Sequence, residues 1–182
     1  MKLPAVIGLS GTFASGKDTL AEYLVGEFGY THVSTGDMIR VEAMKRYGDI
    51  ERPTLVKVGA ELRAESGSGV LAKKALEQSR PVVITGVRAV GEAEAIKSAG
   101  GVMVFVDADP RVRYERMISR SRDSETELSF DEFLANEERE IKAVSADTDQ
   151  NIGAVRELCD ISIDNSGSYE EFFDSATEAF TG

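Results

Sequence analysis

The sequence has very little of the residues on which most metal and redox chemistry depends. Its 182 residues include a single cysteine, Cys159, and a single histidine, His32. One cysteine excludes an internal disulfide and argues against a cysteine-based zinc site. One histidine removes most histidine-dependent metal sites and catalytic triads. We therefore expect both residues to be structural, and any catalysis to depend on other side chains.

Basic residues are also in deficit. The chain has 21 lysines and arginines against 32 aspartates and glutamates, which gives a formal net charge of -11. Binding along a nucleic-acid backbone requires a dense basic face, so we expect no nucleic-acid partner. Any nucleotide bound by this protein must instead meet a few local cations.

Long apolar segments are missing as well. No stretch approaches the roughly 18 apolar residues of a membrane span, and the segment before the first glycine loop is too short for the apolar region of a signal peptide. These absences predict a cytoplasmic protein with no membrane partner. A chain of this length with 42% hydrophobic residues can bury one core, so we expect a single domain over residues 1–182, as a monomer or weak homo-oligomer.

What the sequence does contain is a repeated alternation of short apolar runs and longer helical patterns. In the helical pattern Lys17–Phe28, apolar residues recur four apart, so that one stripe can face a sheet. This alternation predicts a three-layer α/β fold with a parallel sheet covered on both faces. The five apolar runs predicted as strands are Ala5–Ser10, Thr31–Ser34, Pro81–Thr85, Gly101–Val106 and Ile161–Ile163.

Two segments depart from this simple alternation. Between the second and third strands, residues 36–79 predict a helical insertion that holds an acceptor, with helices over Asp37–Tyr47, Thr54–Glu65 and Val70–Gln78. Later, the charged segment Ser121–Leu128 predicts a mobile loop before a helix over Phe130–Lys142. Residues 120–142 are therefore expected to form a short lid. Capping signals at Asp109-Pro110, Ser129-x-x-Glu132 and Ser168-x-x-Glu171 predict helix starts around and after it.

The first strand runs into the G-x-x-x-x-G-K core of a phosphate-binding loop. Glycines permit a tight turn that aims backbone N–H groups inward, the next helix adds its positive end, and the lysine adds a point charge. We expect the loop to bind the phosphates of ATP through Gly11, Ala14, Ser15, Gly16, Lys17, Asp18 and Thr19.

Asp18 stands where such loops usually carry a serine or threonine that helps to hold Mg²⁺. Two interpretations are open. Asp18 binds the metal, directly or through a water, as a hard oxygen donor suited to Mg²⁺. Alternatively, Asp18 faces solvent while Thr19 contacts the α phosphate.

The end of the second strand carries the motif Ser34-Thr35-Gly36-Asp37-Met38-Ile39-Arg40. It resembles the Ser-Thr-Gly-Asp-x-x-Arg segment of adenylate kinases and related nucleoside monophosphate kinases. The resemblance implies that Thr35 lies by the acceptor base, that Asp37 helps to order the magnesium waters, and that Arg40 grips the acceptor phosphate. Taken alone, the motif also fits a capped amphipathic helix with a solvated Arg40.

The third strand ends in Thr85-Gly86-Val87-Arg88, similar to the Gly-x-Arg form of the dephospho-coenzyme A kinase-like branch of these kinases. The resemblance implies that Arg88 is a second acceptor-phosphate arginine. Thr85 replaces an aspartate that usually supports magnesium, so we hypothesise that Asp18 and Asp37 supply the missing carboxylates. Arg63, within the insertion, is a further candidate for the acceptor pocket, although a surface arginine is the commoner outcome.

The arginine-rich stretch after the fourth strand resembles the entry to the lid in the same kinases. The resemblance implies that Arg116 stacks on the donor adenine and that Arg120 clamps the donor phosphates. A basic solvated helix face is the alternative. Arg122 and Arg139 are weaker lid candidates, the latter with acidic neighbours that favour a salt bridge.

After the fifth strand, Asn165 lies in a segment that resembles the adenine-side loop of these kinases. The resemblance as a whole implies transfer of the γ-phosphoryl group of ATP, with Mg²⁺, to a nucleoside or deoxynucleoside monophosphate. The implied catalytic residues are Lys17, Asp37, Arg40, Arg88 and Arg120. The first alternative is a dephospho-coenzyme A kinase, in which Asp37 serves as base toward a ribose hydroxyl. A more distant alternative is a nucleotide-dependent switch or ATPase.

Overall fold

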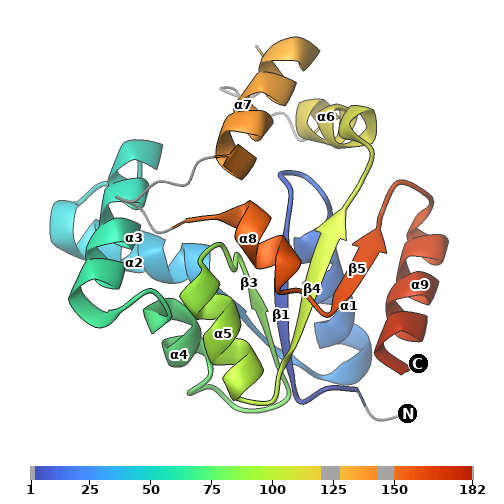
Figure 1. Cartoon of the computed structure of the whole chain (residues 1–182), viewed down its shortest axis with the longest axis horizontal. Helices are drawn as coiled ribbons and strands as arrows, with labels where there is room; N and C mark the ends of the chain where they lie inside the picture. Colours follow the sequence, from blue (N-terminus) through green and yellow to red (C-terminus); the bar gives the residue numbers. More distant parts are fainter. Residues whose placement is uncertain (1–2, 120–127, 143–149, 182) are drawn as a thin grey trace.

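The computed structural model of the chain describes residues 3–119, 128–142 and 150–181, and in them five strands form one parallel sheet. The strands are β1 Val6–Gly11, β2 Thr31–Ser34, β3 Val82–Thr85, β4 Val102–Asp107 and β5 Ile161–Asp164. Their order across the sheet is β2-β3-β1-β4-β5, with the phosphate-loop strand at the centre (Figure 1). The predicted sheet is confirmed, and each predicted run differs from its strand by one residue at most at either end.

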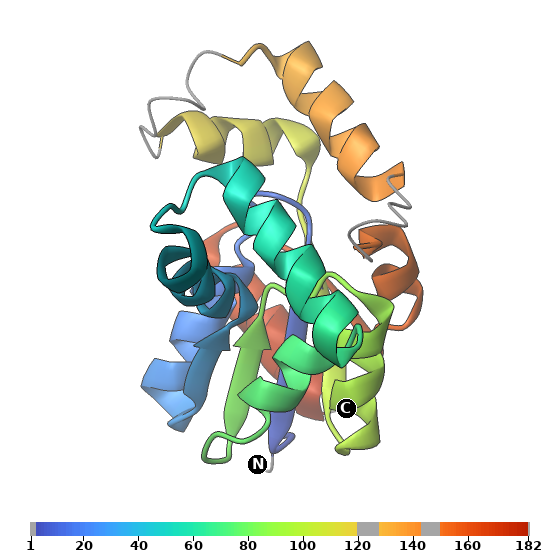
Figure 2. The same cartoon turned by 90° about the vertical axis from the view of Figure 1, so that its left-hand side faces the viewer.

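Helices cover both faces of the sheet because alternate residues of each strand point to opposite sides. Ile7 and Leu9 of β1 pack with α1 (Lys17–Phe28) and α9 (Tyr169–Thr181) on one face. Val6 of the same strand packs on the other face with α4 (Val70–Ala75), α5 (Val90–Ser98) and α8 (Ile152–Glu157). The structure is therefore a three-layer α/β fold, as the sequence predicts (Figures 1 and 2).

The helical insertion between β2 and β3 has a small core of its own. It consists of α2 (Thr35–Tyr47), α3 (Arg52–Ser66) and α4, which pack around Ala43, Val58, Leu62, Val70 and Leu71. The Ser34 hydroxyl caps α2 by accepting the Asp37 N–H at 3.2 Å. The predicted helix to Gln78 ends earlier, at Ala75, because the Glu77 and Gln78 N–H groups bond three residues back in tight turns.

Two helices lie beyond the carboxyl ends of the strands, at the top of Figures 1 and 2. They are α6 (Pro110–Ser119) and α7 (Phe130–Lys142). The buried Arg113 of α6 forms an ion pair with Glu137 of α7, with NH2 2.8 Å from Oε2. The loop predicted at Ser121–Leu128 lies outside the described residues, except for its last residue. Within the described part of the chain, no helix is both long and apolar enough to cross a membrane.

Phe172 of α9 is 1% exposed in the core between α1, α9 and the sheet. We expect Phe172→Ala to lower the free energy of unfolding by about 3–5 kcal/mol, because it removes buried apolar surface and leaves a cavity. Urea unfolding followed by circular dichroism measures the change. The control is Ser175→Ala, an exposed position of the same helix, for which we expect a change within about 0.5 kcal/mol. An equal effect of both substitutions would contradict this view of the core.

Candidate active site

The turn between β1 and α1 has a backbone conformation that most side chains cannot adopt. Gly11 has φ +153°, and a Cβ placed there would lie 2.1 Å from the Val106 carbonyl oxygen. Gly16 has φ +93°, and a Cβ there would lie 2.2 Å from Asn165 Nδ2. Ala14 adds a left-handed residue, at φ +57°. These constraints explain why the motif needs glycine at both positions.

The turn leaves its donors available at the carboxyl edge of the sheet. Helix α1 begins at Lys17, and Gly16 gives it no side-chain cap, so its first N–H groups face the turn. The Ser15 hydroxyl is buried and has no hydrogen-bond partner in the described part of the protein. Backbone donors, a helix N-terminus and a buried hydroxyl together form a nest that suits a phosphate group.

The ends of the two strands on one side of β1, first β4 and then β5, brace this loop. Asn165, after β5, donates from Nδ2 to the Ser15 carbonyl oxygen at 2.8 Å. Asp107, at the end of β4, accepts the Thr12 hydroxyl at 2.7 Å. Arg116 of α6 donates from NH2 to the Asn165 carbonyl oxygen at 2.8 Å. The structure therefore brings Arg116 and Asn165 to the phosphate loop, with the Asn165 amide holding the loop backbone.

A cleft of about 570 Å³ opens beside the loop, between the carboxyl edge of the sheet and the insertion. Its lining contains cations from four segments of the chain, namely Lys17, Arg40, Arg52, Arg63 and Arg88. Asp18 carries the only carboxylate among the described residues that line it. The apolar part of the lining includes Phe13, Ile39, Ile50, Leu55 and Val56. The cleft is thus a locally basic site with an apolar wall, in a chain of net charge -11.

Several predicted site residues meet in this cleft. Lys17, Asp18, Thr35, Arg40 and Arg88 all line it, and Arg63 joins them from the insertion. Sequence reasoning missed Arg52, at the start of α3, because a charged residue beside a helix-starting proline carries no sign of function. Arg120 and Arg122 lie outside the described residues, and the description of Arg139 stops at its backbone in α7.

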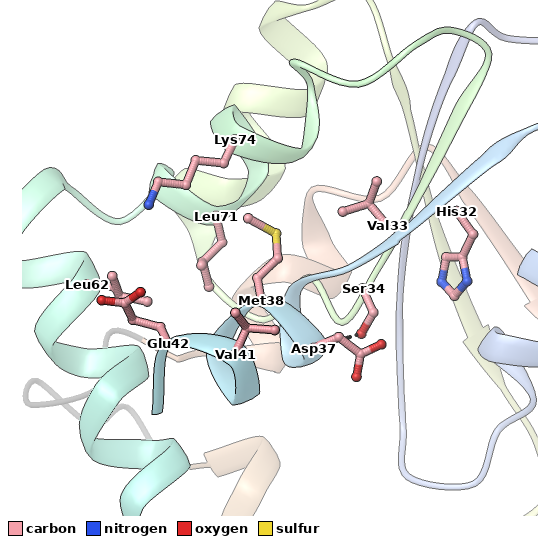
Figure 3. A pocket seen from close by; sticks show the side chains of 10 residues that line it. All are labelled: His32, Val33, Ser34, Asp37, Met38, Val41, Glu42, Leu62, Leu71 and Lys74. Atoms are coloured by element: carbon pink, nitrogen blue, oxygen red, sulfur yellow. Dashed lines mark hydrogen bonds between the residues drawn. The ribbon is translucent and has the colours of Figure 1, made fainter. Parts of the chain in front are cut away.

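Asp37 is placed differently from the other predicted residues. Its carboxylate accepts from Arg40 NH1 at 2.5 Å, and its side chain is 68% exposed. It lines a second cavity, of about 470 Å³, which shares only Ser34 with the cleft lining (Figure 3). That cavity lies beside β2 and α2, and its apolar lining consists of Val33, Met38, Val41, Leu62 and Leu71. Asp37 is therefore absent from the described lining of the cleft, but it contacts Arg40, which belongs to that lining.

The end of β3 has no carboxylate to offer a metal. Thr85 is 1% exposed, and its hydroxyl is hydrogen-bonded to His32 Nε2 at 2.9 Å. Across the described residues, no group of three or more His, Cys, Asp or Glu side chains is placed to hold a metal ion. Asp18 is the one carboxylate in the described lining of the cleft.

Cys159 lines neither cavity. Burial is the largest cause of a rise in the pKa of its thiol to about 11, to which the neighbouring Asp160 adds. The thiolate form that a nucleophile requires is therefore scarce near neutral pH.

Comparison with known proteins agrees with this architecture. The AAA domain family matches residues 7–143. A UPF0200/UPF0201 protein of Archaeoglobus fulgidus is 33% identical over 177 residues, which cover 92% of this chain and 52% of that protein. A UPF0200 protein of Thermococcus kodakarensis is 32% identical over 181 residues, covering 92% of this chain and 91% of that protein. The chain thus spans about half of the first relative and nearly all of the second.

Solved structures share the fold at low sequence identity. Shikimate kinase of Aquifex aeolicus superposes with a TM-score of 0.57 at 20% identity, covering 97% of this chain and 96% of that one. A gluconokinase of Sinorhizobium meliloti superposes with a TM-score of 0.56 at 17% identity, covering 100% and 94%. The fold is therefore the one found in P-loop kinases. With its glycine-rich phosphate loop at the centre of that fold, the chain belongs to the AAA domain family and to the UPF0200 proteins.

Proposed function

We propose that this protein transfers the γ-phosphoryl group of ATP, with Mg²⁺, to the phosphate of a nucleoside or deoxynucleoside monophosphate. The observation that carries the proposal is the local reversal of charge. Five cations line one cleft in a chain of net charge -11, and one carboxylate stands with them in the described lining. A cleft lined by one sign of charge concentrates ligands of the opposite sign, here two phosphate-bearing molecules.

On this proposal, the donor lies against the β1–α1 turn. The loop N–H groups and the Ser15 hydroxyl bind the phosphates, and Lys17 adds charge at the β and γ positions. Mg²⁺, when bound with the nucleotide, neutralises charge on the β and γ oxygens. Arg116 is held at the loop by Asn165, where it can contact the donor. We assign Arg120, which follows in the sequence outside the described residues, to the donor phosphates.

The acceptor lies at the opposite end of the cleft, against the insertion. Arg40 and Arg88 hold its phosphate, while Ile39, Leu55 and Val56 offer an apolar surface to a base. An acceptor phosphate is already ionised, so the reaction needs no general base. Catalysis then consists of positioning the two phosphates and stabilising the charge that spreads over the moving group.

One rival reaction is disfavoured by the placement of Asp37. Transfer to a ribose hydroxyl, as in a dephospho-coenzyme A kinase, requires a base near the acceptor. Asp37, the residue suggested for that role, is paired with Arg40 and lines the other cavity. A nucleotide-dependent switch is disfavoured because it gives no purpose to the arginines at the insertion end of the cleft.

An acceptor screen distinguishes these reactions. ADP formation from ATP is measured with AMP, CMP, UMP, GMP and their deoxy forms, and with dephospho-coenzyme A, shikimate and gluconate. Stimulation by a monophosphate supports the proposal, while stimulation by a hydroxyl acceptor alone points to the rival chemistry. Phosphate release that no acceptor stimulates would favour a switch or ATPase and contradict the proposal.

Lys17→Ala tests the donor site. We expect kcat to fall by about 10²–10³, because the substitution removes a charge that stabilises the transferring group while leaving the turn intact. Steady-state kinetics with the best acceptor measure the loss, and thermal unfolding checks the fold. Lys73→Ala is the matched control, since Lys73 is exposed on α4 and lines neither cavity. Turnover close to wild type in Lys17→Ala would refute the donor assignment.

Asp18→Ala tests the metal contact. We expect the magnesium concentration for half-maximal turnover to rise about tenfold, because a hard oxygen ligand is lost from the cleft. Magnesium titrations at saturating ATP measure the shift. The control is Glu22→Ala, an exposed carboxylate one turn further along α1. An unchanged magnesium dependence would show that Asp18 faces solvent, the second interpretation of the loop.

A further inference from the structure

A carboxylate buried behind the cleft joins two of its arginines. Glu92, in the first turn of α5, is 0% exposed and does not itself line the cleft. Its Oε1 accepts from Arg63 NH2 at 3.0 Å. Its Oε2 accepts the backbone N–H of Arg88 at 2.9 Å and that of Ala89 at 3.1 Å. One side chain therefore contacts both the insertion, through α3, and the segment that follows β3.

Both oxygens of Glu92 are engaged, and each serves a different part of the site. Oε1 fixes the direction of a guanidinium that is itself 4% exposed. Oε2 fixes the backbone at the point where the chain leaves the sheet and presents the Arg88 side chain. A carboxylate accepts at both oxygens, whereas a carboxamide of the same shape accepts at one and donates at the other.

A glycine in α3 leaves space for the Arg63 guanidinium. Gly59 lies one turn earlier in α3, where a Cβ would be 3.2 Å from Arg63 NH1 and 3.3 Å from Ile39 Cδ1. Both neighbours line the cleft. The small residue thus allows the guanidinium to lie along the helix toward Glu92.

We infer that Glu92 is a positioning residue for the acceptor end of the cleft, an inference that rests on the proposed function. It orients the Arg63 side chain and fixes the backbone that carries Arg88. The same carboxylate therefore holds the insertion against α5 and orders the acceptor end of the cleft. Among the described residues, its hydrogen bonds go to Arg63 and to the backbone after β3, and not to the donor loop, so its effect falls on the acceptor.

Glu92→Gln is the first test. We expect the KM for AMP, or for the monophosphate that the acceptor screen selects, to rise about tenfold or more. We expect the KM for ATP to change less than about twofold, because the loop and Lys17 are untouched. Calorimetric titration with AMP and with a non-hydrolysable ATP analogue gives the same comparison without turnover. Glu94→Gln is the matched control, since Glu94 is exposed on the same helix, and we expect it to behave as wild type.

Two variants on α3, where Glu92 contacts Arg63, provide a second test if Glu92→Gln does not fold. Arg63→Met leaves the backbone bonds of Glu92 in place, and Gly59→Ala crowds the guanidinium. We expect both to weaken AMP binding selectively, with binding of the non-hydrolysable ATP analogue unchanged. In the Glu92→Gln background, we expect Arg63→Met to add little further loss, because the two side chains act through one contact.

Three results would overturn the inference. They are an unchanged acceptor KM in Glu92→Gln, equal losses for donor and acceptor that follow the fall in melting temperature, and Arg63→Met or Gly59→Ala variants that bind AMP as wild type does. A wild-type protein that neither binds nor phosphorylates any monophosphate contradicts the proposed function instead. The two failures are therefore distinguishable.

Discussion

The turn between β1 and α1 is the constraint on which the rest of the site depends. Its two glycines sit where any Cβ would collide with the Val106 carbonyl oxygen or the Asn165 amide. Those contacts come from β4, which pairs with β1, and from the end of β5, the strand beyond it. Other strands of the sheet therefore shape the loop as much as its own sequence does. Because the five strands are parallel, their carboxyl ends all lie at the edge of the sheet that carries the loop.

Buried ion pairs connect this edge to the segments that cover it. Arg63 and Glu92 join α3 of the insertion to α5, while Arg113 and Glu137 join α6 to α7. Taking a charge out of water is costly, and breaking such a pair leaves the other charge uncompensated. Each pair therefore specifies one docking geometry more than it adds stability. The covering helices can in this way hold charged side chains at fixed positions in an acidic protein.

Local patterns predicted the sheet well and the intervening short helices poorly. The strands are buried apolar runs with clear turn residues, and α1 has a regular apolar stripe, so sequence alone locates them. Helices α5 and α8 were not predicted, because α5 buries Ala93 and Ile96 beside the polar Glu92, and α8 has six residues. Each helix is too short to show a clear helical period of apolar residues, and its apolar face is evident only against the sheet that it covers.

The motifs located the phosphate loop and most cations of the cleft, but not how charges pair across it. The role of Glu92 depends on an arginine 29 residues away, a contact that no local spacing encodes. The motif of Asp37 predicts a metal contact, and the structure adds an ion pair with Arg40, three residues further along α2. Thr85 is neutral and Asp37 is absent from the described lining, so that lining offers Mg²⁺ one carboxylate, Asp18. On the proposed function, the metal therefore depends on the nucleotide's own phosphates for most of its ligands and enters the cleft with it.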